Sequence, residues 1–176
     1  MRQADYDGSH EQAGGAMRQV EGGDAAPKGE ERVLAHFSIS SEPGNERLAM
    51  QQVTDAVQEL ALPQRTIKRL GTAVAEATMN AIEHGNQNRA ELPVEIQVLA
   101  SEGRLTVQIV DQGGHRPIPD VTTPDLEAKL AELDRPRGWG LFLIKNLVDE
   151  MEVGGDELHH VLRLSLHLEG AASDGQ

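Results

Sequence analysis

The sequence predicts an α/β two-layer sandwich of the α+β class, with a mixed, mainly antiparallel sheet covered on one face by helices. Two kinds of periodicity support this. Several short segments alternate apolar and polar residues, which indicates half-buried strands. Longer segments place apolar residues at every third or fourth position, which indicates amphipathic helices. Along the chain these segments follow the order strand, two helices, two strands, a glycine- and proline-rich lid, helix, two strands.

The first predicted strand spans 33–39 and is followed by two helices. Its apolar positions alternate and are expected on one buried face: Val33, Ala35, Phe37 and Ile39. After a turn signal, a helix is expected over about 46–61. Pro63 suits the first turn of a second helix, because its missing N–H would be unpaired there anyway. That helix is expected to reach about Glu83, and Gly85 is expected to close it as a C-terminal cap.

The second half of the domain is predicted to consist of two strand pairs separated by a break and a helix. Four segments alternate and are predicted as strands: 94–99, 105–110, 151–153 and 158–168. Glycines and prolines interrupt the pattern over 113–124, and a short amphipathic helix is expected near 125–133. A further helix is expected over about 140–149. The last two strands are expected to form a hairpin.

Both ends of the chain are predicted to be disordered tails around a domain that spans 32–169. Residues 1–31 contain six glycines, with seven acidic and three basic side chains. Such a segment cannot bury enough apolar surface to offset the entropy lost on ordering. Residues 170–176 have the same character.

Composition limits the classes of function that the chain can perform. Its formal charge of -13 disfavours direct binding to nucleic acids or to anionic membranes. There are no cysteines, which excludes disulfides, thiolate metal sites and a cysteine nucleophile. No apolar run approaches the roughly 20 residues that span a bilayer, and the first residues lack the apolar core of a signal peptide. A soluble cytoplasmic protein is therefore expected.

The second predicted helix carries three polar residues at spacing i, i+4, i+8: Glu76, Asn80 and His84. At α-helical geometry they share one stripe of the surface. The amide oxygen of Asn80 can bind Mg²⁺, which prefers oxygen ligands. The Glu76 carboxylate can act as a base toward an attacking hydroxyl group. The stripe alone leaves open the simpler explanation of a solvated helix face.

A second candidate element is the run Asp-Gln-Gly-Gly over 111–114, at the end of a predicted strand. A carboxylate at this place can accept a hydrogen bond from an exocyclic amino group. The glycines would let a ligand approach the backbone closely. By itself the run is also compatible with an ordinary turn that ends a strand.

A third candidate element opens the helix expected after 140. Gly138 and Gly140 would expose backbone N–H groups where the helix dipole favours an anion. Arg135 and Arg137 could add charge-assisted hydrogen bonds to phosphate oxygens. A flexible loop with a glycine hinge is the alternative, since short glycine motifs often match by chance.

In this order and spacing, the three elements resemble the nucleotide-binding motifs of the GHKL ATPase superfamily, which includes gyrase-, Hsp90-, histidine-kinase- and MutL-type domains. The run EATMNAIEHGN over 76–86 resembles its N box. DQG over 111–113 resembles the first glycine box, and RGWGLFLI over 137–144 resembles the second. The resemblance covers about 31–168 and implies a Bergerat-type ATP-binding fold. Its compact form resembles the anti-sigma-factor serine/threonine kinases of bacterial stress and sporulation switches.

The resemblance implies roles for residues in the first two motifs. Asn80 would hold the Mg²⁺ that bridges the phosphates of ATP. Glu76 would be the catalytic base that activates the incoming nucleophile. Asp111 would bind the adenine amino group, and Gly113 would pack beside the base. His84, within the N box, belongs to the expected ATP-binding set.

The third motif would surround the phosphates. Gly138 and Gly140, followed by Leu141, would cradle them at the helix start, with Trp139 between the two glycines. Arg137, with Arg135 as the alternative, would neutralise phosphate charge. The segment 113–137 would form a lid that orders around the nucleotide.

Two positions depart from the family pattern. His115 follows Gly114 where the first glycine box usually has a second glycine. His159, His160 and Val161 stand where the late strand usually offers a threonine near the adenine. The two histidines would alternate faces on a strand, so they are a poor metal pair.

The resemblance implies a kinase that is also an anti-sigma factor. Such a protein sequesters a sigma factor and phosphorylates a STAS-domain anti-anti-sigma protein, with ATP and Mg²⁺ as cofactors. Sigma-factor surfaces are often basic because they face DNA, which suits an acidic partner. A homodimer is also implied, and the first strand and first helix are its expected interface.

Two alternatives stay open at this point. One is a related switch kinase that acts on a scaffold or phosphatase regulator. The other is a nucleotide-gated binding module without transfer activity, to which the two departures give some weight. A histidine kinase fits less well, because 1–31 carry no signature of a dimerisation helix pair. Gyrase-, Hsp90- and MutL-like proteins also fit less well, because they need further transducer domains, which are not expected in this sequence.

Overall fold

Five strands form a single sheet in the computed structural model, which describes residues 31–114 and 139–168. The strands are β1 (Arg32–Ser40), β2 (Pro93–Ser101), β3 (Arg104–Asp111), β4 (Glu150–Gly155) and β5 (His160–His167). Their spatial order is β1-β2-β3-β5-β4. The predicted α+β class is confirmed. The expectation of a mixed sheet is wrong for the described strands, because every pairing among them is antiparallel.

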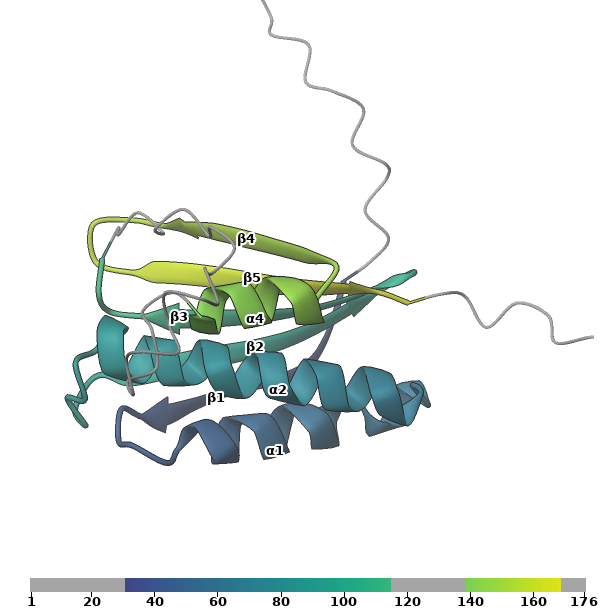
Figure 1. Ribbon diagram of the computed structural model, residues 1–176, viewed down its shortest axis with the longest axis horizontal. Coiled ribbons are helices and arrows are strands. Elements are labelled where there is room, and N and C mark those ends of the chain that lie inside the picture. The colour runs from purple at the N-terminus through teal and green to yellow at the C-terminus, as the bar shows by residue number, and fades with distance from the viewer. Residues whose placement is uncertain (1–30, 115–138, 169–176) are drawn as a thin grey trace, which may run out of the picture.

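The helices lie together on one face of this sheet (Figure 1). They are α1 (Glu46–Ala56), α2 (Gln64–Asn80) and α4 (Trp139–Leu147). A 3₁₀ turn, η1 (Gln58–Leu60), follows α1, and a π-helical turn, η2 (Ala81–Gly85), extends α2. α2 contacts both α1 and α4, so it is the central element of the helical layer.

Strand register builds an aliphatic core under the helices. Ile96, Ile109 and Leu162 align across β2, β3 and β5, and none of the three is more than 5% exposed. Because side chains alternate along a strand, the next inward residues form further rows of the same kind. The chain has only four Phe, Tyr and Trp residues, so branched aliphatic side chains fill this space.

The first strand differs from its prediction at one end. A β-bulge between Val33 and Ala35 shifts the register against β2. Val33 pairs with Leu99 on the face without helices and is 52% exposed, whereas Leu34 packs against the core. The expectation that Val33 shares the buried face of Phe37 is therefore wrong. A bulge places two residues opposite one, which reverses the alternation.

Both predicted helices of the first half end earlier than expected. The α-helix begun at Glu46 ends at Ala56 and gives way to η1. The second ends at Asn80, where the hydrogen bonding changes to i→i+5: the N–H of Asn86 donates to the carbonyl of Ala81 at 2.8 Å. Gly85 lies inside this π-turn and its φ is not positive, so it does not form the predicted C-terminal cap.

Several predictions fall on residues outside the described ranges. These are the tail over 1–31 except for its last residue, the tail over 170–176, the helix near 125–133 and nearly all of the lid over 113–137. The candidates His115, Arg135, Arg137 and Gly138 also lie there. In the part of the chain that the structure describes, no helix has the length and apolar character needed to cross a bilayer.

Candidate active site

Asp111 is the last residue of β3, and its side chain lies on the helix-covered face of the sheet. It is 3% exposed, although the neighbouring positions on that face are aliphatic. Its Oδ1 accepts a hydrogen bond from the N–H of Gly113 at 2.8 Å. This hydrogen bond fixes the rotamer of the Asp111 carboxylate. Its donor, Gly113, belongs to the same DQG motif as Asp111.

The backbone of Gly85 packs directly against the Asp111 carboxylate. A Cβ built on Gly85 would lie 2.6 Å from Oδ1 and 2.7 Å from Oδ2 of Asp111. Real Cβ atoms do not approach oxygen that closely, so any side chain here would displace the carboxylate. The glycine is therefore required by close approach between η2 and β3, not by a left-handed backbone conformation.

His160 approaches the same carboxylate from the neighbouring strand. Asp111 and His160 are register partners on β3 and β5. The imidazole Nδ1 lies 3.1 Å from Oδ2 of Asp111, and the His160 side chain is 16% exposed. Asp111 is thus contacted by Gly85 of η2, by Gly113 of the turn after β3 and by His160 of β5.

Asn86 connects this end of the sheet to the helix layer. It is fully buried, and its Oδ1 accepts the N–H of Gln112 at 2.7 Å. Its amide nitrogen donates to three oxygens: Ser41 Oγ, Leu92 O and Pro93 O. One side chain thus joins the end of η2, the end of β1, the start of β2 and the residue after Asp111.

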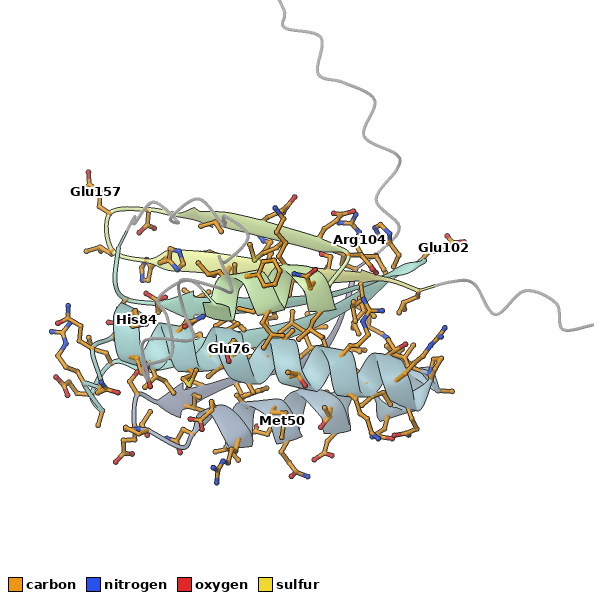
Figure 2. The ribbon with its side chains drawn as sticks, viewed as in Figure 1. Met50, Glu76, His84, Glu102, Arg104 and Glu157 are labelled. Carbon is orange, nitrogen blue, oxygen red and sulfur yellow. The ribbon has the colours of Figure 1, made fainter. Side chains whose placement is uncertain are left out.

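Glu76 and Asn80 lie one turn apart on α2 and meet the first turn of α4. A Cβ built on Gly140 would collide with Oε1 of Glu76 and would lie 3.1 Å from Nδ2 of Asn80. Both polar side chains are half-buried. Figure 2 shows Glu76 midway along the helix layer, and the glycine contacts place it beside the start of α4.

Two other predicted site residues take different positions. His84 lies on η2, and its side chain is exposed, whereas Glu76 and Asn80 are half-buried. The i, i+4, i+8 stripe assumed a continuous α-helix, and the π-turn invalidates that assumption after Asn80. Leu141 packs against the core from α4. For Trp139 the structure describes only the helical backbone.

The residues present fit a magnesium nucleotide. Asp111 offers a buried acceptor at the sheet end, where a base amino group would find a partner. The Asn80 amide offers a hard oxygen ligand and lies beside Gly140 on α4. No group of three or more His, Cys, Asp or Glu among the described residues could hold a metal alone. Mg²⁺ needs no such group, because it keeps waters and phosphate oxygens as ligands.

The sequence matches the model of one protein family over most of the domain. Residues 39–166 match the histidine kinase-like ATPase domain. The chain belongs to this family. The resemblance to the GHKL superfamily is thereby confirmed, and ATP binding follows from membership at the level of the family.

Relatives within the family share a common description. An anti-sigma F factor of Clostridium botulinum (strain Eklund 17B / Type B) is 30% identical over 123 residues, which are 69% of this chain and 85% of the relative. An anti-sigma F factor of Bacillus cereus (strain AH187) is 33% identical over 122 residues, covering 69% and 81%. These similarities confirm the resemblance to anti-sigma factors.

A solved structure supports the same fold. The RsbU and RsbW domains of a Mycobacterium tuberculosis protein match with a TM-score of 0.57 and 17% identity. The match covers 78% of this chain and 33% of that chain. At this identity the likeness concerns the fold alone.

Sequence reasoning missed two contacts that shape the site. Asn86 stands in the N-box run, but nothing local indicates that it would be buried or would bind Gln112. His160 was noted only as a departure from the family pattern, although strand register makes it the neighbour of Asp111. A pairing of β3 with β5 in the correct register would have revealed that contact.

Proposed function

We propose that this protein is an ATP- and Mg²⁺-dependent serine/threonine kinase that acts as an anti-sigma factor in a partner-switching pathway. Its substrate would be a STAS-domain anti-anti-sigma protein. The observation that carries the proposal is the convergence of Glu76 and Asn80 with Gly140 at the start of α4. Family membership and the names of the relatives support it.

The site divides into two ends with separate tasks. Asp111, held by Gly113 and His160, would accept the amino group of adenine. Asn80 would ligate Mg²⁺ through its amide oxygen, and the N–H groups at the start of α4 would face phosphate oxygens. The π-turn η2 connects the two ends, because it follows Asn80 and its Gly85 lies against Asp111.

Glu76 would act on the incoming hydroxyl group. Bound ATP supplies the phosphoryl group that is transferred. The Glu76 carboxylate accepts the proton of the serine or threonine hydroxyl, which raises the nucleophilicity of its oxygen. The Glu76 carboxylate lies against Gly140 on α4, beside the position where the phosphates would lie. Positioning and charge neutralisation carry most of the catalysis in reactions of this class.

The proposed partners are proteins of complementary charge. The net charge of -13 gives the chain an acidic field, which would favour a basic surface such as the DNA-facing side of a sigma factor. Neither direct nucleic-acid binding nor membrane binding is part of the proposal. We propose that the protein acts as a homodimer in the bacterial cytoplasm.

The test compares nucleotide binding and phosphoryl transfer in matched variants. Glu76→Gln keeps the size of the side chain and removes the base. It should bind ATP with unchanged Kd and lose transfer to a STAS-domain substrate by at least about 100-fold. Glu102→Gln removes an exposed carboxylate from the β2–β3 turn, away from the site (Figure 2), and should transfer at the wild-type rate.

Three results would change the proposal. Wild-type transfer by Glu76→Gln would remove Glu76 from the role of base. Nucleotide-dependent capture of a sigma factor, with no transfer by the wild-type protein, would favour a nucleotide-gated binding module. Capture of a scaffold or phosphatase regulator in place of a sigma factor would favour the related switch kinase.

A further inference from the structure

Asp111 and His160 form a close acid–imidazole pair at the end of the sheet. Nδ1 of His160 lies 3.1 Å from Oδ2 of Asp111, and both side chains are largely buried. Their positions follow from strand register, since the two residues are direct partners on β3 and β5. Both residues of the pair therefore belong to the sheet itself.

The neighbouring His159 does not contact Asp111, which shows that this contact is particular to His160. His159 precedes β5, is much more exposed, and directs its ring at Asp156 within the β4–β5 hairpin. The N–H groups of Leu158 and His159 bond to Asp156 and lower the pKa of its carboxyl group. Of two neighbouring histidines, the fold brings only His160 to Asp111 within the described ranges.

We propose that His160 is a positioning residue for nucleotide binding, and that its protonation weakens the affinity for adenine nucleotides. This inference rests on the proposed function, because it takes Asp111 as the acceptor for the base. With a neutral ring, Nδ1–H donates to Oδ2 and leaves the pair with one negative charge. With a protonated ring, the pair is neutral overall.

The loss of negative charge matters because the ligand group is a donor. An amino N–H bonds more strongly to an ionised carboxylate than to one already neutralised by a cation. Asp111 is the charged group that faces the ring from β3. On β4 the register partner of His160 is Gly155, which has no side chain, and on η2 the backbone of Gly85 lies against the carboxylate.

The test measures the Kd of fluorescent ADP with Mg²⁺ from about pH 8 to about pH 5, the range over which histidine side chains change charge. His160→Gln keeps a side-chain N–H donor that does not titrate. Relative to His160→Gln, the wild-type protein should lose about tenfold in affinity across this range. Because both proteins meet the same ligand, protonation of the nucleotide cancels from the ratio. His159→Gln should follow the wild-type profile.

A second measurement uses the wild-type protein alone, so that the test survives a variant that fails to fold. The ¹⁵N spectrum of the His160 ring at high pH should show the tautomer with a proton on Nδ1, and this signal should shift when ADP binds. A proton on Nε2 instead, or no shift with ADP, would overturn the proposal. So would a pH profile of His160→Gln that superimposes on the wild-type profile.

Failure of the proposed function would look different. A wild-type protein that shows no saturable binding of adenine nucleotide at any pH would refute both the function and this inference. If the wild-type protein binds ADP, but the ratio of its Kd to that of His160→Gln does not change with pH, only the role of His160 is refuted.

Discussion

The side-chain oxygen of Asn86 accepts a hydrogen bond from the backbone N–H of Gln112 at 2.7 Å. This contact joins the end of η2 to the residue that follows Asp111. Because Asn86 is fully buried and its amide nitrogen also has partners, its rotamer is fixed. The end of the sheet that carries Asp111 is thereby held against the helix that carries Glu76 and Asn80.

Replacing Asn86 with aspartate should strongly destabilise the protein. The change keeps the shape but sets a carboxylate oxygen against the carbonyls of Leu92 and Pro93, which now accept N–H bonds. We expect the free energy of unfolding to fall by about 2–5 kcal/mol, as for other losses of a buried polar network. Urea denaturation measures this. Asn88→Asp, at an exposed position with positive φ that aspartate tolerates, should change stability little.

Replacing Gly140 with alanine should separate activity from stability. The new Cβ would collide with Glu76 and crowd Asn80, so it should displace both side chains. We expect transfer activity to fall by about 100-fold, because small misplacements of catalytic groups are costly. Thermal denaturation should show little loss, since alanine favours a helix over glycine.

Gly71→Ala is the matched control, because it also adds a Cβ to a helical glycine. Its neighbours would be Thr54 and Met50 on α1, at 3.2 and 3.3 Å. This variant is expected to alter stability through α1–α2 packing and to leave transfer unchanged. Equal activity losses in the two variants would show that the contact with Glu76 is not the cause.

Thr78→Val should stabilise the protein. Thr78 is fully buried on α2, and its Oγ1 is the buried side-chain polar atom without a hydrogen-bond partner among the described residues. Valine has the same shape without the hydroxyl group, so the variant should gain about 1 kcal/mol. Thr72, on the exposed side of the same helix, bonds to the carbonyl of Lys68 at 3.0 Å. Thr72→Val should give no such gain in the melting temperature.

Acidification should remove a contribution of Glu150 to the stability of the folded protein. The hydrogen bond from the His167 ring, and the charge of Arg104, lower the pKa of the Glu150 carboxyl group below its usual 4.5. A lowered pKa in the folded state means that ionised Glu150 stabilises the fold above about pH 4.5, and that this contribution is lost as pH falls through the folded pKa.

The check is the difference in unfolding free energy between the wild-type protein and Glu150→Gln as a function of pH. The difference should shrink as the pH falls below about 4.5. Glu102→Gln serves as the control. A difference that grows as the pH falls below about 4.5 would contradict the lowered pKa of Glu150.

Local patterns in the sequence predicted the strands and the helical layer well, because alternation and helical periodicity report burial directly. These patterns failed where one extra residue interrupts the regular repeat of a strand or helix. The bulge before Ala35 turned Val33 outward, and the π-turn ended the stripe after Asn80. Neither feature has a strong local signal, since both arise from how distant segments pair.

The candidate site shows the same division. Glu76, Asn80 and Gly140 were predicted from motifs, and the structure brings them together. Glycine at 85 was predicted as a helix cap, whereas the structure requires it because the Asp111 carboxylate lies against its backbone. The sequence alone cannot show that contact. The contact of His160 with Asp111 joins residues 49 positions apart, and only the register of β3 against β5 reveals it.

The π-turn η2 makes the length of this segment as important as its composition. A π-turn contains one more residue than an α-helical turn. Deleting any one residue over 81–85 would allow α-helical geometry, but it would rotate the following chain by about 100° and draw it back by about 1.5 Å. Asn86 could then no longer reach Gln112, and the backbone that now lies on Asp111 would move away. Exposed positions such as Glu83 can therefore accept many side chains, whereas the number of residues between Asn80 and Asn86 cannot change without separating the two ends of the site.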